Sequence, residues 1–313
     1  MTRSFNRKVD EKIYKKGMCR IAGLQYAWVL VMINYIKMDL FRLFKSVSFY
    51  VCSAVLLLMI GMTILEVRSI EKTGREQWME EAGVSETKDD PEDEIVVGGV
   101  GIDSLKVADE GTVGGCMNAI YNGNVMAFIV LLIVSIFICN EYSGGYIKNT
   151  ITIPKYRWYF NISKLVTASV VIVIENILAV LAFILATKFV FKDVVIGDIT
   201  QLIGYLALEA LLLLGMAAIV MLICNIIRSK AVGIIFSLLM AFQVVVFPIL
   251  IVCCTFLKFK YETVAKFLMT LASKNIAPEL GRQTVIETLA LAAGALLIYT
   301  LLSNLVISKK DIG

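Results

Sequence analysis

Four polar residues of this sequence lie inside long apolar runs, where their side chains could bind or carry an ion away from bulk water. Glu175 and Asn176 share one run, Glu209 lies in the next, and Gln243 lies in the run after that. An ionisable group in the centre of a bilayer costs about 2.5–3.5 kcal/mol on insertion scales, so such residues are candidates for function. They could line a polar path, join membrane subunits or bind a proton. A protonated or locally hydrogen-bonded carboxyl is the structural alternative.

The composition excludes much other chemistry. The 313 residues include no histidine, which removes His-ligated metal sites and Ser-His or Cys-His nucleophiles. The seven cysteines show no CxxC spacing and most lie in or beside apolar runs, which predicts buried, inert thiols. We therefore expect no catalytic residue, no metal site, no cofactor bound to this chain and no nucleic-acid partner.

The candidate residues must be held by membrane helices. With 58% hydrophobic residues and a mean hydropathy of +0.80, the chain is predicted to be an all-α polytopic membrane protein. A spanning helix needs about 20 mostly apolar residues. Six stretches qualify, at 47–67, 121–139, 165–189, 202–224, 231–257 and 284–307. The fifth contains Pro248, which predicts a kink there or an end near Phe247 followed by a re-entrant segment.

Charge predicts the orientation of these spans. Residues 68–124 form a large acidic insert with the core SETKDDPEDE, whereas bases gather before Val47, between the second and third spans, and at the C-terminus. Basic segments stay in the cytoplasm, so we expect a multi-pass protein of the cell membrane with both termini inside. The insert then lies outside as a small module or a solvated cap. The basic stretch from Lys258 to Gln283 departs from this rule, because the number of spans puts it outside.

Two segments precede the six-span domain of residues 47–313. Residues 1–31 are a basic N-terminal extension, and Met32 is an alternative natural start. Residues 32–46 are predicted to form an amphipathic helix, with Asp39, Arg42 and Lys45 away from its apolar face. Such a helix would lie in the membrane surface as an elbow before the first span. A cytoplasmic extension of that span is the alternative.

The segment NEYSGGYIKNTITIPKYRWYFNISK, residues 140–164, is long for a simple connection. Gly144 and Gly145 can end the preceding helix, residues 146–153 can form a short helix, and Pro154 can end that helix. The basic and aromatic residues that follow Pro154 are suited to docking a partner. A belt of interfacial aromatic residues with a basic topology signal is the alternative.

Together, KMDLFRLFKSVSFY, the large insert, NEYSGGYIKNTI and PKYRWYFNISK resemble the type-2 ATP-binding-cassette (ABC) exporter permeases. The resemblance covers residues 32–313 and is greatest to small six-span permeases linked to bacteriocin or lantibiotic export or immunity. It implies short re-entrant outer helices before the last span. It also implies a coupling helix in the cytoplasmic loop that docks on an ATPase, with the docking residues Glu141, Gly144, Gly145, Ile147, Lys148, Pro154, Arg157 and Lys164.

The resemblance also implies partners and a function. The sequence has no GxxxxGK[ST] phosphate loop, so ATP and Mg are expected in a separate ATPase, present in two copies. Six spans form half of such a transporter, which implies a second permease copy or a related permease within the membrane lipid. The expected function is ATP-driven export of a hydrophobic or amphipathic substrate, such as an antimicrobial peptide. The alternatives are an ion-coupled secondary transporter that uses Glu175 and Glu209, and a membrane sensor whose acidic loop binds a ligand.

Overall fold

The computed structural model describes residues 32–74, 100–109, 112–144, 157–189, 197–256, 258, 264, 268–274, 276 and 281–309. Within these ranges the secondary structure is helical and contains no strand, which confirms the predicted all-α class. Residues 1–31, most of the acidic insert and most of the predicted coupling loop lie outside them.

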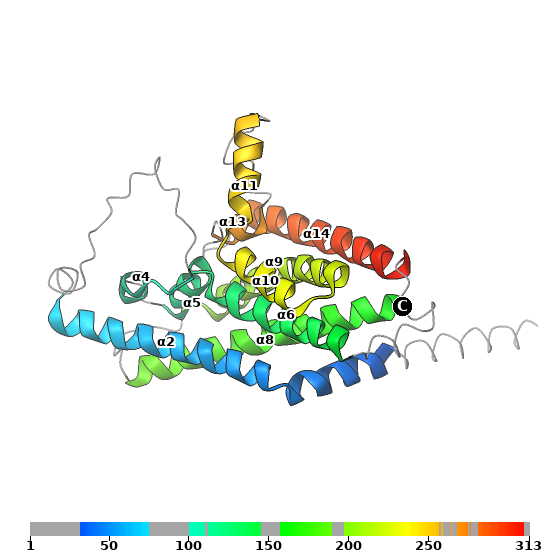
Figure 1. The fold of residues 1–313 in the computed structure, drawn as a ribbon. Coiled ribbons are helices and arrows are strands. Elements are labelled where there is room, and N and C mark those ends of the chain that lie inside the picture. The colour runs from blue at the N-terminus through cyan, green and yellow to red at the C-terminus, as the bar shows by residue number, and fades with distance from the viewer. Residues whose placement is uncertain are drawn as a thin grey trace, which may run out of the picture.

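A bundle of long apolar helices forms the body of the protein (Figure 1). In the described part of the chain, five helices are long and apolar enough to cross a membrane. They are α2 (Val47–Thr73), α6 (Val125–Ser143), α8 (Arg157–Phe189), α9 (Ile199–Ile227) and α14 (Arg282–Lys309). Each matches one of the predicted spans, although α6 begins at Val125 because Gly123 and Asn124 form a turn before it.

Helices α6 and α9 form the centre of the bundle. In α6, 72% of the membrane-spanning window is buried by protein, compared with 11% in α14. A helix that is apolar on every side is suited to the interior, and α6 reads VMAFIVLLIVSIFIC without a charge before its last turn. The apolar outer surfaces of α2 and α14 are left for lipid or for another membrane subunit.

Residues 32–45 form a helix that ends at Ser46, where the extended backbone interrupts the chain before α2 begins. We call the end of the bundle at which this helix lies the elbow end. The sequence analysis placed Asp39 away from the apolar face of this helix, but the structure buries it. The Asp39 side chain is only 1% exposed and points into the protein, whereas Phe41 is 68% exposed.

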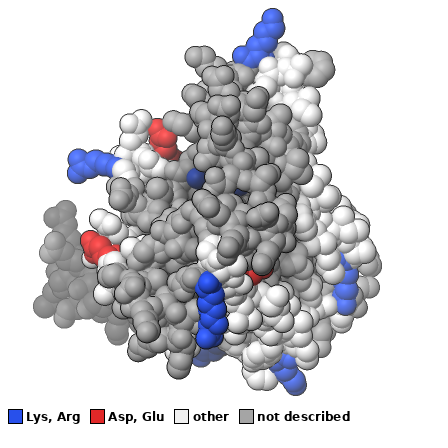
Figure 2. All heavy atoms as spheres, turned by 90° about the vertical axis from the view of Figure 1, so that its left-hand side faces the viewer, with Lys and Arg blue, Asp and Glu red and all other residues white. Residues whose placement is uncertain are grey.

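The opposite end of the bundle, which we call the α5 end, carries three short helices: α4 (Ser104–Asp109), α5 (Val113–Asn122) and α13 (Met269–Lys274). Helix α5 is almost fully buried, so the later part of the acidic insert packs onto the bundle. The close approach of Gly101 to Gly123 leaves no room for a side chain at Gly123. Figure 2 views this end, and the described charged side chains are scattered over it without forming a single patch.

The predicted fifth span, 231–257, is not a single helix. Helix α10 (Lys230–Ala241) is only 12 residues long and is followed by a turn in which Gln243 has a φ of 60°. Helix α11 (Val246–Ile251) and the π-helix η2 (Val252–Phe256) then project from the bundle at a steep angle (Figure 1). The break precedes Pro248, which lies in the first turn of α11, where a missing backbone N–H costs little.

Candidate functional site

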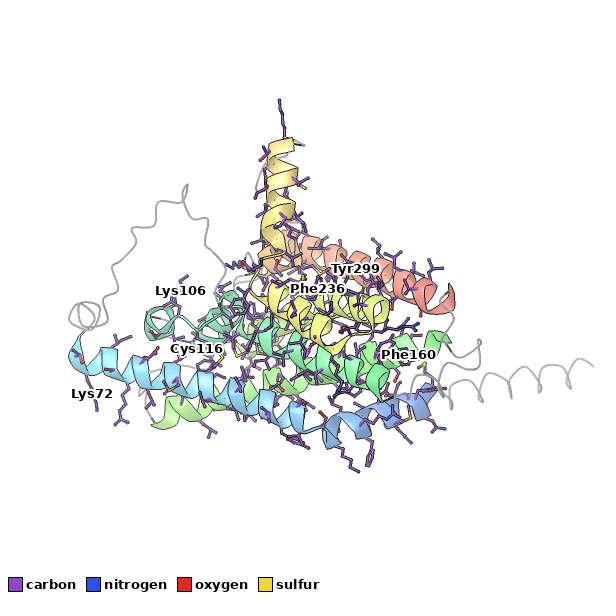
Figure 3. All side chains as sticks on the ribbon, viewed as in Figure 1. Lys72, Lys106, Cys116, Phe160, Phe236 and Tyr299 are labelled. Atoms are coloured by element: carbon purple, nitrogen blue, oxygen red, sulfur yellow. The ribbon has the colours of Figure 1, made fainter. Side chains whose placement is uncertain are left out.

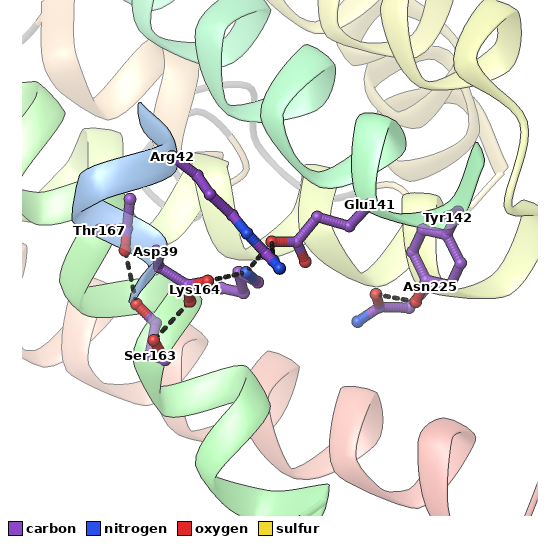
Figure 4. A network of polar contacts seen from close by, with 8 residues as sticks. All are labelled: Asp39, Arg42, Glu141, Tyr142, Ser163, Lys164, Thr167 and Asn225. Carbon is purple, nitrogen blue, oxygen red and sulfur yellow. Dashed lines mark hydrogen bonds and ion pairs between the residues drawn. The ribbon is translucent and has the colours of Figure 1, made fainter. Parts of the chain in front are cut away.

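A buried cluster of ion pairs occupies the elbow end (Figure 4). Lys164 Nζ lies 2.7 Å from Asp39 Oδ1 and also donates to Glu141 Oε1. Arg42 Nη1 lies 3.4 Å from the same Glu141 oxygen. Ser163 Oγ donates to Asp39 Oδ2 at 2.5 Å. The cluster thus joins the helix of residues 32–45 to α6 and α8.

Helical spacing and aromatic packing position these groups. Asp39 and Arg42 are three residues apart and therefore lie on the same side of their helix. Glu141 lies in the last turn of α6, and Lys164 lies in the third turn of α8. The Lys164 ammonium lies 4.8 Å from the centre of the Phe137 ring and 4.9 Å from that of Phe160. These rings cover the lysine and keep it from water.

The charges of this cluster balance, with two acids and two bases in contact. Asp39, Glu141 and Lys164 are each less than 5% exposed, so water screens their attraction weakly. Loss of one partner from a buried ion pair leaves an uncompensated charge and costs about 3–5 kcal/mol. The arrangement therefore favours one relative position of the three helices.

The structure shows where some of the predicted docking residues lie. Glu141 and Lys164 lie on either side of the loop, but both are buried, so the structure favours a positioning role over direct contact with a partner. Gly144 caps α6 and is exposed, and Arg157 begins α8. Lys45 is exposed and lies apart from the ion pairs. Gly145, Ile147, Lys148, Pro154 and the predicted coupling helix lie outside the described residues.

A second polar group, also at the elbow end, was missed by the sequence analysis. Asn225 of α9 accepts from the Tyr142 hydroxyl at 2.5 Å and donates to Ser303 Oγ at 2.6 Å. Asn161 Nδ2 donates to Asn304 Oδ1 at 2.5 Å. This asparagine cluster joins α6, α8, α9 and α14. One signal could have found it, because each of these helices carries an amide or hydroxyl residue close to the same end of its apolar run.

Glu175 and Asn176 are both buried but have different partners. Glu175 Oε1 accepts from Ser53 Oγ of α2 at 2.5 Å, while Oε2 has no hydrogen-bond partner among the described residues. Asn176 Oδ1 accepts from the Tyr121 hydroxyl of α5 at 2.7 Å. Burial raises the pKa of Tyr121 above its usual range, which keeps this hydroxyl protonated as a donor.

Glu209 and Gln243 hold short segments at the α5 end. Glu209 Oε2 accepts from Ser273 Oγ of α13 at 2.7 Å, and Oε1 has no hydrogen-bond partner in the described part of the chain. Gln243 Nε2 donates to Asn124 Oδ1 at 3.0 Å. Each of the four intramembrane candidates has a different hydrogen-bond partner, and Tyr121, the partner of Asn176, also lies within electrostatic reach of Glu209.

The described residues contain no group of three or more Cys, Asp or Glu side chains that could hold a metal ion. Cys139 and Cys224 are buried, as predicted for inert thiols, and their sulfurs lie 3.5 Å apart between α6 and α9. Both sulfurs pack against Gly233, which lets α10 approach this pair closely.

Comparison with known proteins gives a family for the centre of the chain. Residues 106–244 match the family described as "ABC-2 family transporter protein". The matched range runs from α4 to the turn after α10 and includes Glu141 and Lys164. No curated protein matches the chain.

Proposed function

Given that this chain is a type-2 ABC permease of the ABC-2 transporter family, we propose that it exports a hydrophobic or amphipathic substrate with energy from a separate ATPase. The family match and the apolar helices support a multi-pass membrane transport subunit. The absence of a phosphate loop from the sequence supports ATP hydrolysis in another polypeptide. Antimicrobial peptides are substrates of the proposed kind, because one face is apolar and the other charged.

The observation that carries the proposal is the buried ion-pair cluster. Glu141 lies on the last turn before residues 145–156, the predicted docking segment, and Lys164 lies shortly after that segment. A partner that pulls on this segment therefore moves both residues. Because they also contact Asp39 and Arg42, the helix of residues 32–45 is drawn along with them.

We propose that this connection turns ATPase closure into movement of the membrane helices. A packed, charge-balanced junction resists gradual distortion, so α6, α8 and the first helix move as a rigid body. The mostly apolar outer surfaces of the bundle allow sliding against lipid or a second permease half. Two permease halves and two ATPase copies complete the proposed transporter.

The first test is copurification of the tagged chain from its native membranes in mild detergent. The wild type is expected to bring down an ATPase with nucleotide-binding motifs. Gly145→Pro, which alters the loop backbone, is expected to lose it while its size-exclusion profile stays unchanged. Recovery of no ATPase with the wild type would overturn the proposal.

The same preparation distinguishes a residue that binds the ATPase from a residue that transmits movement between the ATPase and the membrane helices. Lys164→Met is expected to keep the ATPase, because Lys164 is buried, but to lose stimulation of ATP hydrolysis by substrate. The matched control is Lys45→Met, which removes an exposed lysine near the cluster and is expected to retain both. If Lys164→Met lost the ATPase while its size-exclusion profile stayed unchanged, and Lys45→Met kept the ATPase, Lys164 would belong to the docking surface instead.

Ion-coupled transport is a second candidate, for a specific reason. Glu175 and Glu209 are fully buried, and each has one carboxyl oxygen without a partner among the described residues. A buried acid in a membrane can carry a proton. This candidate predicts proton flux into vesicles containing the purified chain, and loss of that flux in Glu175→Gln and Glu209→Gln. ATP-dependent transport that is unchanged in both variants would exclude it.

A further inference from the structure

An apolar cavity of about 950 Å³ lies on the side of the bundle. Its walls come from α9, α10, α11, residues 268–270 and α14. Phe236 of α10 and Tyr299 of α14, both labelled in Figure 3, belong to the lining. The volume falls within the range of about 300–1,000 Å³ that is typical of small-molecule sites.

Small residues on α14 create this space. Ala290, Gly294 and Ala295 face the cavity where larger side chains would fill it. Ala290 and Gly294 are four residues apart, so they lie one above the other on one side of the helix. A Cβ atom added to Gly294 would meet no other atom within 4 Å. The cavity is therefore open at this position and can be filled without disturbing a neighbouring helix.

The cavity is apolar along its length and charged at one place. Among the described residues that line it, Glu287 alone carries a charge, and Thr270 and Tyr299 add neutral polar groups. Gln283 Nε2 donates to Glu287 Oε1 at 3.1 Å. Glu287 and Tyr299 are 12 positions apart in α14. At about 1.5 Å per residue this spacing gives the lining a length of roughly 18 Å.

We propose that this cavity binds a single-chain cationic amphiphile, with its positive head at Glu287 and its hydrocarbon chain extended along α14 towards Tyr299. The proposal names the substrate class of the exporter proposed above and rests on that function. In a bilayer an apolar wall does not by itself prefer this ligand, because lipid chains are equally apolar. The carboxylate provides the selection, since it attracts an ammonium group and repels the phosphate of a phospholipid. The lining, roughly 18 Å long, accommodates an extended hydrocarbon chain.

The test is equilibrium binding of radiolabelled dodecyltrimethylammonium to the purified chain in lipid nanodiscs, with empty nanodiscs to subtract partitioning into lipid. Saturable binding is expected for the wild type. Gly294→Leu fills the cavity and is expected to abolish it. The matched control is Gly61→Leu in α2, where an added Cβ also meets open space, and it is expected to bind normally. Equal binding by the two leucine variants would overturn the proposal, as would the lack of saturable binding to the wild type.

A second pair of variants tests the charge. Glu287→Gln is expected to weaken binding by about tenfold, because the neutral amide no longer attracts the quaternary ammonium group. Glu66→Gln removes an exposed carboxylate of α2 and is expected to have no effect. Unlabelled dodecyl phosphate, which carries a phosphate and no ammonium group, is expected to compete poorly. Competition equal to that of the unlabelled cation would identify the cavity as a lipid site and overturn the proposal.

Copurification of the ATPase with each variant distinguishes failure of the proposed ligand site from failure of the proposed exporter function. If Gly294→Leu retained both the ATPase and normal ligand binding, the ligand site would be wrong and the transporter assignment would stand. If the wild type bound the cation saturably but recovered no ATPase, the cavity would stand and the exporter would not.

Discussion

Replacement of Lys164 by methionine removes the cation that contacts both buried acids of the elbow end. Asp39 and Glu141 then keep their positions but lose this compensating charge, although Arg42 still lies 3.4 Å from Glu141. Methionine has a similar length and fits between the Phe137 and Phe160 rings, so the change leaves little cavity. The electrostatic effect therefore dominates the packing effect.

The expected loss follows from the burial of the cluster. Lys164 and Asp39 side chains are each 2% exposed, and removal of one partner of such a pair costs about 3–5 kcal/mol. An exposed lysine contributes little, so Lys45→Met is expected to change stability by less than about 0.5 kcal/mol. The free energy of unfolding is measured for both variants by titration with sodium dodecyl sulfate in mixed micelles, with helix content followed by circular dichroism.

A variant that removes both acids together with the lysine tests the reasoning itself, since the remaining Arg42 side chain is 27% exposed and its charge reaches water. In the triple variant Asp39→Asn, Glu141→Gln, Lys164→Met, no acid remains unpaired in the cluster, and neutral replacements of buried ion pairs are often well tolerated. We expect it to recover most of the stability lost in Lys164→Met. A single variant as stable as Lys45→Met, or a triple variant no better than the single one, would refute the electrostatic explanation.

Three further substitutions test the packing of the bundle, two in the same titration and the third by proteolysis. Asn225→Leu leaves the Tyr142 hydroxyl without its partner and is expected to cost about 1–3 kcal/mol; a change below 0.5 kcal/mol would contradict this role. Gly233→Ala places a Cβ 2.6 Å from Cys139 Sγ and is expected to cost about 1–3 kcal/mol, with recovery when Cys139→Ala is added. Gly123→Ala meets the backbone at Gly101 and is expected to expose the chain near residue 101 to protease, whereas wild-type resistance would show that the segment can shift.

The sequence by itself determined the fold class and the position of most membrane helices. A bilayer provides no water to satisfy backbone N–H and C=O groups, so an apolar run of sufficient length has to form a helix. The runs that became α2, α6, α8, α9 and α14 could therefore be found from composition alone. The predicted topology, the coupling helix and the position of the elbow helix in the membrane surface remain predictions.

Local patterns were less informative at the ends and breaks of helices. The sequence indicated a break in the fifth span at Pro248, yet the helix already ends at Ala241. Gln243 is held there by Asn124, which is distant in the sequence. The helix break therefore coincides with a tertiary hydrogen bond at the turn. Proline alone predicted the wrong position for this break.

Only the tertiary structure decided which polar residues belong together. Asp39 looked like a surface residue of an amphipathic helix, and Glu141 and Lys164 looked like parts of a docking loop, but they form one buried cluster. Glu175 and Glu209, which the sequence places in two different spans, are anchored to different helices. Hydropathy reports how well a residue tolerates lipid, and this depends on the residue itself. Charge pairing depends on the distance and burial of groups that can lie over 100 residues apart, as for Asp39 and Lys164, and both are determined only when the helices pack.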